Sequence, residues 1–232
     1  MKLLSIVIPV WNNWSFTKKC LEDLSSLPDD HEIIVVDDNS TDGTDRGLGE
    51  SSVISIRNGQ NCGFARSCNN GYQISDGQYV MFLNNDVRVR KDKDSWTKPI
   101  IEEASSGGLV GPTVGVLDSE LGFVCEAHKM PKFGIPYMSA WNLTASRKTW
   151  DSLILDDHCG PFSEEFGRAF FEDTDLSFRA RELKIPFKIV SVPVYHFGHR
   201  TTNKVDTNGL YKTAREIFVK KWHGRINGIS TS

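Results

Sequence analysis

The chain has 232 residues, of which 39% are hydrophobic and 25% are charged, and its formal net charge at pH 7 is −3. This length suits one large domain with its own hydrophobic core, and the composition is ordinary for a soluble globular protein. The negative net charge argues against a protein whose affinity depends on broad contact with nucleic-acid phosphates.

The cysteines and the N-terminal residues indicate a compartment. Five cysteines at irregular spacing form neither a disulfide framework nor a zinc-binding pattern, which favours a reducing environment. The first apolar run, residues 3–10, is interrupted by Pro9 and is too short for a signal peptide. No window of the sequence approaches the length of a membrane span. We therefore expect a cytoplasmic protein.

The first half of the chain alternates between short apolar runs and helical patterns. Strands are predicted at residues 3–8, 32–36, 51–56 and 79–83, and helices at 15–27 and 61–75. Strands that alternate with helices indicate βαβ units. We therefore predict an α/β fold with a mostly parallel, Rossmann-like central sheet flanked by helices.

The second half is less regular. It predicts helices at 96–105, 176–183 and 209–222, and short strands at 109–111, 122–124, 187–190 and 192–195. Residues 126–165 are rich in Gly, Pro and aromatic residues, and we expect them to form an excursion on the substrate side of the protein. The last helix is amphipathic. It could pack on its own sheet or pair with a second copy, so a homodimer is possible at this point.

One strand leads directly into polar residues. Residues 79–83 are five large apolar or aromatic residues, which suits a strand buried on both faces, and Asn84, Asn85 and Asp86 follow it. Ligands of open α/β sheets bind beyond the carboxyl ends of the strands. A carboxylate there can hold a hard cation together with substrate phosphates. A simple turn is the alternative, and these residues alone favour neither reading.

Six segments, taken in order, resemble glycosyltransferases of family 2, which have the GT-A fold. They are residues 5–12, 33–44, 61–71, 82–86, 171–176 and 195–199. The resemblance implies a single GT-A domain over residues 1–232. It divides into a nucleotide-binding half (1–90), a smaller acceptor half (91–200), and a C-terminal helix and tail (201–232).

The resemblance also implies an activity. The family transfers sugars, and we expect this chain to move a single sugar from a nucleotide-sugar, with UDP as the expected nucleotide, to a hydroxyl acceptor. Relatives use glycans, lipid-linked sugars, proteins and small molecules as acceptors. The membrane helices of processive synthases are absent from the sequence, which favours single-sugar transfer.

The resemblance assigns nucleotide binding to Pro9, Trp11, Asn12, Asp38, Asn61, Arg66, Asn69, Asn84 and Asn85. Trp11 takes the position of an aromatic residue that packs on the base, although it could also be a core or lid residue. Asp38 matches the acceptor of a uracil N–H. Arg66, near a helix N-terminus, suits a diphosphate, and a surface salt bridge is an equal alternative.

A metal site is implied at Asp86. Many relatives have Asp-x-Asp where this chain has Asn84-Asn85-Asp86, so Asp86 keeps the position of the direct ligand while Asn84 brings no charge. His196 is the further ligand we expect, with His199 as its rival. The ion is Mn²⁺ or Mg²⁺, and an imidazole ligand favours Mn²⁺.

Glu172 and Asp173 are the expected catalytic pair. In the family the Asp of this pair is the general base, which takes the proton of the acceptor hydroxyl as its oxygen attacks the anomeric carbon. Glu172 would orient the acceptor, and Asp175 would cap the following helix. One base facing a metal-held leaving group implies inversion through an oxocarbenium-like transition state. Helix capping alone is the simpler alternative for these acids.

Trp141 could stack on a sugar of the donor or acceptor, or it could be a core residue. Two other functions compete with the transferase. The first is a catalytically idle nucleotide-sugar-binding module, which Asn84 favours. The second is a nucleotidyltransferase-like enzyme, although the segment after the first strand lacks the usual Gly-rich basic loop.

Overall fold

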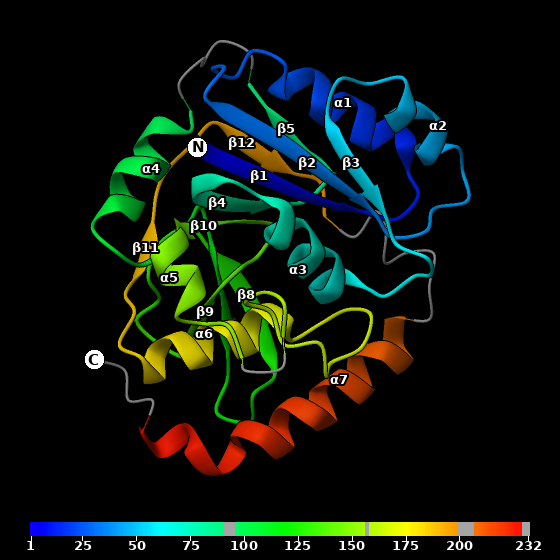
Figure 1. The fold of residues 1–232 in the computed structure, drawn as a ribbon. Coiled ribbons are helices and arrows are strands. Elements are labelled where there is room, and N and C mark those ends of the chain that lie inside the picture. The colour runs from blue at the N-terminus through cyan, green and yellow to red at the C-terminus, as the bar shows by residue number, and fades with distance from the viewer. Residues whose placement is uncertain (91–95, 156–157, 199–206, 229–232) are drawn as a thin grey trace.

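The computed structural model describes residues 1–90, 96–155, 158–198 and 207–228. Its centre is a seven-stranded sheet with the order β11-β6-β10-β4-β1-β2-β3 (Figure 1). The strands are β1 (Lys2–Val10), β2 (His31–Asp37), β3 (Ile54–Arg57), β4 (Gly77–Leu83), β6 (Leu109–Gly111), β10 (Asn142–Ser146) and β11 (Phe187–Ile189). All pair in parallel except β10, which is antiparallel to both β4 and β6. The predicted α/β fold with a mostly parallel sheet is confirmed.

Two small sheets flank this centre. One joins β5 (Val87–Val89) to β12 (Val194–His196), and the other joins β7 (Val114–Leu117) to β8 (Phe123–Ala127) and β9 (Ile135–Met138) in the order β8-β7-β9. The strands of both small sheets pair antiparallel.

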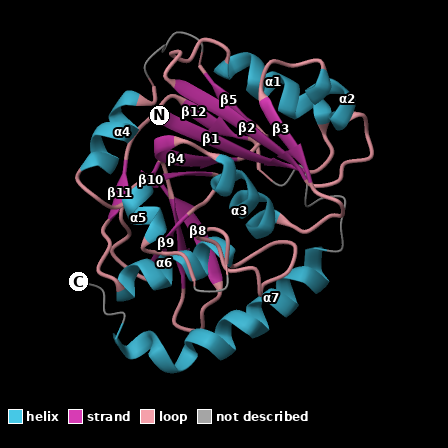
Figure 2. Ribbon diagram, viewed as in Figure 1, coloured by secondary structure: helices cyan, strands magenta, loops and turns pink. Residues whose placement is uncertain are grey.

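Helices lie on both faces of the central sheet (Figure 2). They are α1 (Trp14–Leu24), α2 (Thr44–Gly49), α3 (Phe64–Ile74), α4 (Lys98–Ser105), α5 (Arg147–Asp151), α6 (Glu172–Glu182) and α7 (Thr207–Trp222), followed by a 3₁₀ helix (His223–Gly228). In the described parts of the chain, no helix combines the length and apolarity needed to cross a membrane.

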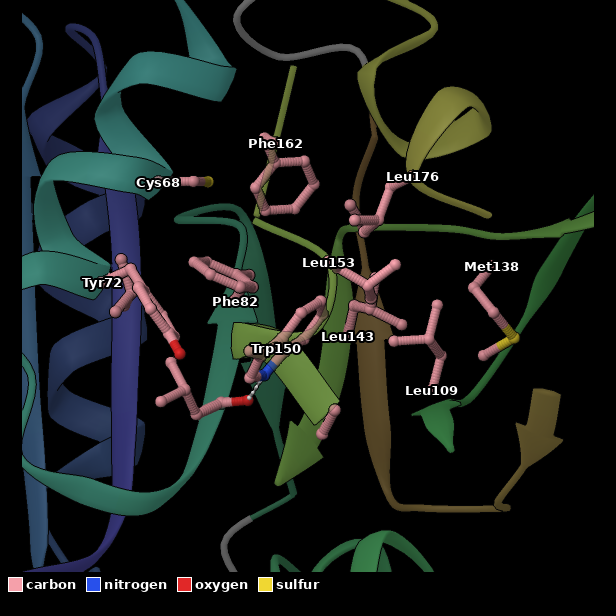
Figure 3. Close-up of a cluster of buried hydrophobic side chains, with 14 of the residues drawn as sticks. Cys68, Tyr72, Phe82, Leu109, Met138, Leu143, Trp150, Leu153, Phe162 and Leu176 are labelled. Atoms are coloured by element: carbon pink, nitrogen blue, oxygen red, sulfur yellow. Dashed lines mark hydrogen bonds between the residues drawn. The ribbon is translucent and has the colours of Figure 1, made fainter. Parts of the chain in front are cut away.

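The central strand β4 supplies both halves of the core. Val80 and Phe82 point to the face covered by α3, α5 and α6, whereas Met81 and Leu83 point to the face covered by α1 and α4. On the first face the ring of Phe82 lies 5.1 Å from that of Trp150 and 4.9 Å from that of Phe162 (Figure 3). The alternation agrees with a strand buried on both sides.

The structure corrects the prediction for residues 126–165. This segment was expected to be an excursion, but β10 within it is a strand of the central sheet between β4 and β6. Asn142 and Thr144 of β10 are fully buried although they are polar. They interrupt the apolar pattern on which strand prediction depends, which explains the error.

The last helix packs against its own chain. Ala214, Phe218 and Trp222 of α7 are fully buried against a cluster that includes Phe178 of α6. The rings of Phe178 and Phe218 are 5.1 Å apart. Figure 1 shows α7 running along the side of α6 that faces away from the central sheet. These apolar residues of α7 are therefore covered within the chain.

Candidate active site

The candidate site lies at the carboxyl edge of the central sheet. β1 is parallel to β2 and β4, so Val10, Asp37 and Leu83 end at the same edge. The backbone N–H of Asp38 donates to the carbonyl oxygen of Val10 at 2.7 Å, which joins the two loops at this edge. The sequence-predicted polar residues of the first half are thus brought to one side of the sheet.

Asp86 and His196 meet although they are 110 residues apart in the chain. Asp86 follows β4 and is 6% exposed. His196 pairs with Val87 in the small sheet of β5 and β12. Its Nε2 lies 3.1 Å from Oδ1 of Asp86 and 3.2 Å from Nδ2 of Asn84. The two side chains predicted as metal ligands therefore converge, together with Asn84, which was predicted to bind the nucleotide.

The pair has a separation that fits a divalent ion. Two ligands held at right angles about 2.1 Å from one ion are about 3.0 Å apart. Nε2 of His196 and Oδ1 of Asp86 are 3.1 Å apart. No group of three or more His, Cys, Asp or Glu side chains able to hold a metal occurs in the described parts of the chain. An ion at this pair would complete its coordination with phosphates and water. His199, the rival ligand, lies outside the described residues.

Trp141 contacts this pair directly. Its indole ring stacks on the imidazole of His196, with ring centroids 4.9 Å apart and planes inclined by 12°. Its Nε1 donates to Oγ1 of Thr113 at 2.9 Å and to Oε1 of Glu126 at 2.7 Å. Trp141 is 9% exposed, so most of its surface is taken up by these protein contacts. Sequence reasoning missed Thr113 and Glu126, because single polar residues outside any motif give no signal.

The acid pair begins α6. Phe170 and Phe171 before it have positive φ angles of 79° and 67°, so the chain turns sharply into the helix. Oδ2 of Asp173 accepts from the backbone N–H of Ala140 at 3.2 Å, and Oδ1 accepts from Oγ1 of Thr174 at 3.2 Å. Ala140 therefore contacts the acid pair. Trp141, the next residue in the chain, contacts the Asp86–His196 pair.

The two acids are held in different protonation environments. Burial, with repulsion from Asp173, raises the pKa of Glu172 to about 8. Burial also raises the pKa of Asp173, to about 6, while hydrogen bonds from Ala140 and Thr174 act in the opposite direction. Oε2 of Glu172 is buried and has no hydrogen-bond partner among the described residues. Burying a carboxyl group whose oxygen has no hydrogen-bond partner costs less free energy in the protonated form than in the charged form.

Asp38 is buried and accepts several hydrogen bonds from the segment before α3. Oδ1 accepts from Nδ2 of Asn58 and from the backbone N–H of Cys62, both at 2.8 Å, and Oδ2 accepts from the backbone N–H of Gly63 at 2.7 Å. A carboxylate has about four acceptor positions. The amide of Asn61, described below, is a fourth donor, so a uracil N–H bound to Asp38, as the sequence predicts, would have to share or replace one of the four.

Trp11, Asn12 and Asn61 line the same loops. In the amide orientation that satisfies both of its partners, Asn61 accepts from Nε1 of Trp11 at 3.0 Å and donates to Oδ2 of Asp38 at 3.1 Å. Asn12 accepts from the backbone N–H of Thr41 at 2.7 Å. These bonds tie the loop after β1 to the loops after β2 and β3. Trp11 and Asn12 are partly exposed, so they can contact a ligand.

Asn69 has a different position from the one expected for a nucleotide ligand. It is fully buried in α3, donates to the carbonyl oxygen of Phe162 and to Oε1 of Glu164, both at 2.8 Å, and accepts from the N–H of Phe162 at 3.0 Å. Because a buried amide must be satisfied, these bonds fix the 162–164 segment onto α3. Its side chain has no surface left for a nucleotide.

Asn85, Arg66 and Pro9 also make protein contacts. Nδ2 of the buried Asn85 donates to Oγ1 of Thr17 in α1 at 2.9 Å. Arg66 forms an ion pair with Glu164, and its side chain is 51% exposed. Pro9 lies within β1, in register with Val36 of β2. Arg66 is the most exposed member of this group, Pro9 is partly exposed and Asn85 is buried.

Known proteins resemble this chain in sequence and in fold. The model of the family described as "Glycosyl transferase family 2" matches residues 5–162. The poly(ribitol-phosphate) beta-glucosyltransferase of Bacillus spizizenii is 35% identical over 92 residues, which are 36% of this chain and 14% of that protein. The glycosyltransferase GlyG of Streptococcus pneumoniae is 25% identical over 116 residues, which are 47% of this chain and 38% of that protein. This chain thus covers less than half the length of either relative.

Solved structures share the fold over most of the chain. GalNAc-T7 with UDP, GalNAc and Mn²⁺ has a TM-score of 0.67 at 16% identity, over 84% of this chain and 43% of that chain. Residues 1–349 of TarS from S. aureus have a TM-score of 0.59 at 16% identity, over 88% and 63%. The mannosyltransferase PcManGT from Pyrobaculum calidifontis, with GDP-Man and Mn²⁺, has a TM-score of 0.58 at 15% identity, over 81% and 54%.

Proposed function

The chain belongs to glycosyltransferase family 2, and from this premise we propose that it transfers a single sugar from a nucleotide-sugar to a hydroxyl acceptor, with inversion and with a divalent metal ion. The family and the GT-A fold, both expected from six sequence segments, are confirmed by the family match and by the structural likenesses. The donor nucleotide, the metal, the stereochemistry and the catalytic residues are parts of the proposal.

The observation that carries the proposal is that residues 140 and 141 link the Glu172–Asp173 pair to the Asp86–His196 pair. Ala140 donates to Asp173, and the next residue, Trp141, stacks on His196, which faces Asp86. Asp86 and His196 would hold the ion. When bound, a divalent ion offsets the charge that develops on the departing nucleoside diphosphate.

Asp173 is the general base in this proposal. The acceptor oxygen forms a bond to the anomeric carbon while the bond from that carbon to the diphosphate oxygen breaks, and the hydroxyl proton passes to Asp173. When the environment pushes the pKa values of two neighbouring acids apart, the group with the lower pKa acts as the base. Burial raises the pKa of both acids, and repulsion from Asp173 raises that of Glu172 further, which favours a protonated Glu172 that donates to the acceptor and an Asp173 that takes the proton.

The nucleotide would bind along the loops that Asp38 organises. Trp11 supplies an aromatic surface for the base, Asn12 and Asn61 border it, and Asn84 lies within reach of a ribose next to the ion. Arg66 is proposed to leave its ion pair with Glu164 and bind the diphosphate. UDP is the proposed nucleotide. GalNAc-T7 with UDP and PcManGT with GDP-Man, both holding Mn²⁺, support a nucleoside diphosphate with Mn²⁺ as the general ligand.

The test is a transfer assay with purified protein and panels of UDP-sugars, GDP-sugars and glycoside acceptors, in Mn²⁺, in Mg²⁺ and in EDTA. We expect turnover with a UDP-sugar and Mn²⁺, loss of turnover in EDTA, and a product of inverted anomeric configuration by NMR. Asp86→Asn and Asp173→Asn should each lower the rate by about 100-fold or more. Asp29→Asn, a surface change on the loop before β2, should leave the rate unchanged.

A result in which both Asp variants turn over like the unaltered protein would overturn the assignment of these residues. The runner-up function is a nucleotide-sugar-binding module without catalysis, which the amide of Asn84 in place of a carboxylate favours. Nucleotide-dependent stabilisation in a melting assay, combined with neither transfer nor donor hydrolysis across the panels, would replace the transferase by this module.

A further inference from the structure

Glu126 lies in the small three-stranded sheet and is not among the residues assigned above to the donor or the base. Its Oε1 accepts two hydrogen bonds, from Oγ1 of Thr113 at 2.5 Å and from Nε1 of Trp141 at 2.7 Å. Thr113 lies in the connection between β6 and β7, and Glu126 lies on β8. The indole N–H is thus fixed from outside the central sheet by a charged acceptor, which makes the hydrogen bond stronger than one between neutral groups.

Trp141, whose indole Glu126 holds, contacts both halves of the Asp86–His196 pair, once through its ring and once through its backbone. Its ring stacks on the imidazole of His196. The backbone carbonyl oxygen of Trp141 accepts from the N–H of Asn84 at 2.9 Å, two residues before Asp86. Trp141 therefore touches the turn that carries one member of the pair and the ring of the other.

We propose that Glu126 is a positioning residue for the metal pair, acting through the indole of Trp141. The inference rests on the proposed function, because it takes Asp86 and His196 to be the metal ligands. In this inference Trp141 orients His196, whereas the sequence suggested that it stacks on a sugar. The three-stranded sheet β8-β7-β9, which carries Glu126, then helps to hold the ion. Thr113 supports the same contact by donating to the same oxygen.

The physical reason is the narrow tolerance of a two-ligand site. Nε2 of His196 must stay about 3 Å from Oδ1 of Asp86 to share one ion, and the stacked indole limits rotation of the imidazole away from that position. Without the Glu126 carboxylate, the indole N–H keeps only the neutral acceptor Oγ1 of Thr113, and that hydroxyl has itself lost its partner, so the indole is held less firmly. Partners that orient metal ligands typically change metal affinity by 10–100-fold when they are removed.

The test measures Mn²⁺ affinity of the full chain without substrate, from the EPR signal of free Mn²⁺. Glu126→Ala and Trp141→Phe should each weaken binding by about 10-fold or more. Glu126→Gln, which keeps an oxygen acceptor at this position, should restore the affinity to within about 3-fold of the unaltered protein. Glu120→Ala, which removes an exposed acid between β7 and β8, should leave the affinity unchanged.

Two further measurements separate positioning from general damage to the fold. The double variant of Glu126→Ala and Trp141→Phe should bind Mn²⁺ no more weakly than Trp141→Phe alone, because Glu126 acts through the indole N–H that this variant already removes. In the transfer assay, Glu126→Ala should need more Mn²⁺ for half-maximal rate but recover its kcat at saturating Mn²⁺. A general loss of structure would lower kcat at every Mn²⁺ concentration.

The outcomes also separate this inference from the proposed function. Asp86→Asn and His196→Ala should each weaken Mn²⁺ binding by more than Glu126→Ala does. Should neither of them weaken it, the metal site itself is wrong and the positioning role falls with it. Should both weaken it while Glu126→Ala binds Mn²⁺ like Glu120→Ala, the metal site stands and the role of Glu126 is overturned.

Discussion

The backbone N–H of Gly63 donates a hydrogen bond to Oδ2 of Asp38 at 2.7 Å, which joins the turn before α3 to the acidic loop after β2. Gly63 has a positive φ of 88°, and a Cβ at this position would lie 2.4 Å from the α-carbon of Arg168. The next residue, Phe64, donates its N–H to the carbonyl oxygen of Arg168 at 3.0 Å. The nucleotide half and the segment before α6 thus meet at a point that leaves no room for a side chain.

We therefore predict that Gly63→Ala destabilises the protein by about 2–4 kcal/mol, because the left-handed backbone and the contact with Arg168 both oppose a side chain. The measurement is the free energy of unfolding in urea. Gly59→Ala is the matched control in the same connection, since no atom lies within 4 Å of its added Cβ and its φ is not positive. Equal unfolding free energies for the two variants would contradict the close approach at Gly63.

The contact between α6 and α7 predicts a second stability effect. Nε1 of Trp222 donates to Oδ1 of Asp175 at 2.8 Å, and both residues are fully buried. Oδ2 of Asp175 accepts from Nε of Arg179 at 2.8 Å. Asp175 therefore anchors the last helix, in place of the helix-capping role that its sequence position suggested.

Trp222→Phe should cost about 2–4 kcal/mol of unfolding free energy, because it removes volume from the core and leaves a charged, buried acceptor with one donor fewer. Trp96→Phe is the control. Trp96 is also buried, but its indole N–H makes no hydrogen bond to the residues that the structure describes. The difference between the two variants, measured by urea unfolding, should be about 1–3 kcal/mol; if they cost the same, the bond to Asp175 adds nothing to stability.

The part of the fold that sequence predicts best is the half with the strongest patterns. β1, β2 and β4 are continuous apolar runs bounded by turn residues, and this combination favours buried parallel strands wherever it occurs. β10 was missed because Asn142 and Thr144 occupy buried positions of the strand. α2 was missed because a six-residue segment with two glycines has no helical periodicity to detect.

The candidate site also contains residues whose positions the sequence predicts and residues whose contacts it does not. Asp86 and His196 were named together because each lies in a recognisable motif, and the structure brings their side chains to 3.1 Å. Asn69 and Arg66 lie in motifs too, but their partners Phe162 and Glu164 are more than 90 residues away in the chain. Contacts of that range are decided by the packing of the whole chain and leave no local signal in sequence.

The raised pKa of Glu172 gives a pH-dependent prediction for stability. Burial and the neighbouring Asp173 raise the pKa of Glu172 from 4.5 to about 8, so between these values the folded chain binds more protons than the unfolded chain. Stability from this group is therefore fully present below pH 4.5 and is lost as pH rises towards 8. Glu172→Gln, which cannot ionise, removes that loss.

Thermal unfolding at several pH values checks this prediction. At pH 8 to 9, Glu172→Gln should be more stable than the unaltered protein by about 1–3 kcal/mol, and at pH 4 the two should be within about 0.5 kcal/mol of each other. Glu216→Gln, an exposed position on α7, serves as the control and should show no such divergence. A difference that is the same at pH 4 and pH 9 would show that ionisation of Glu172 is not its cause.

The ion pair between Arg66 and Glu164 predicts that the diphosphate of the donor competes with Glu164 for the guanidinium of Arg66. The Arg66 side chain is half-exposed, and Glu164 also accepts from Nδ2 of Asn69 through Oε1. Arg66→Gln should raise the donor KM by about 10-fold with little change in kcat, because it removes a charge-assisted contact to the diphosphate. Glu164→Gln keeps the acceptor for Asn69 but removes the competing charge, so it should lower the donor KM by about 2–5-fold.

Steady-state kinetics with the donor varied at saturating acceptor measures the donor KM of both variants. If the pair is only a surface salt bridge, both variants should keep the donor KM of the unaltered protein and differ from it in stability by less than about 1 kcal/mol.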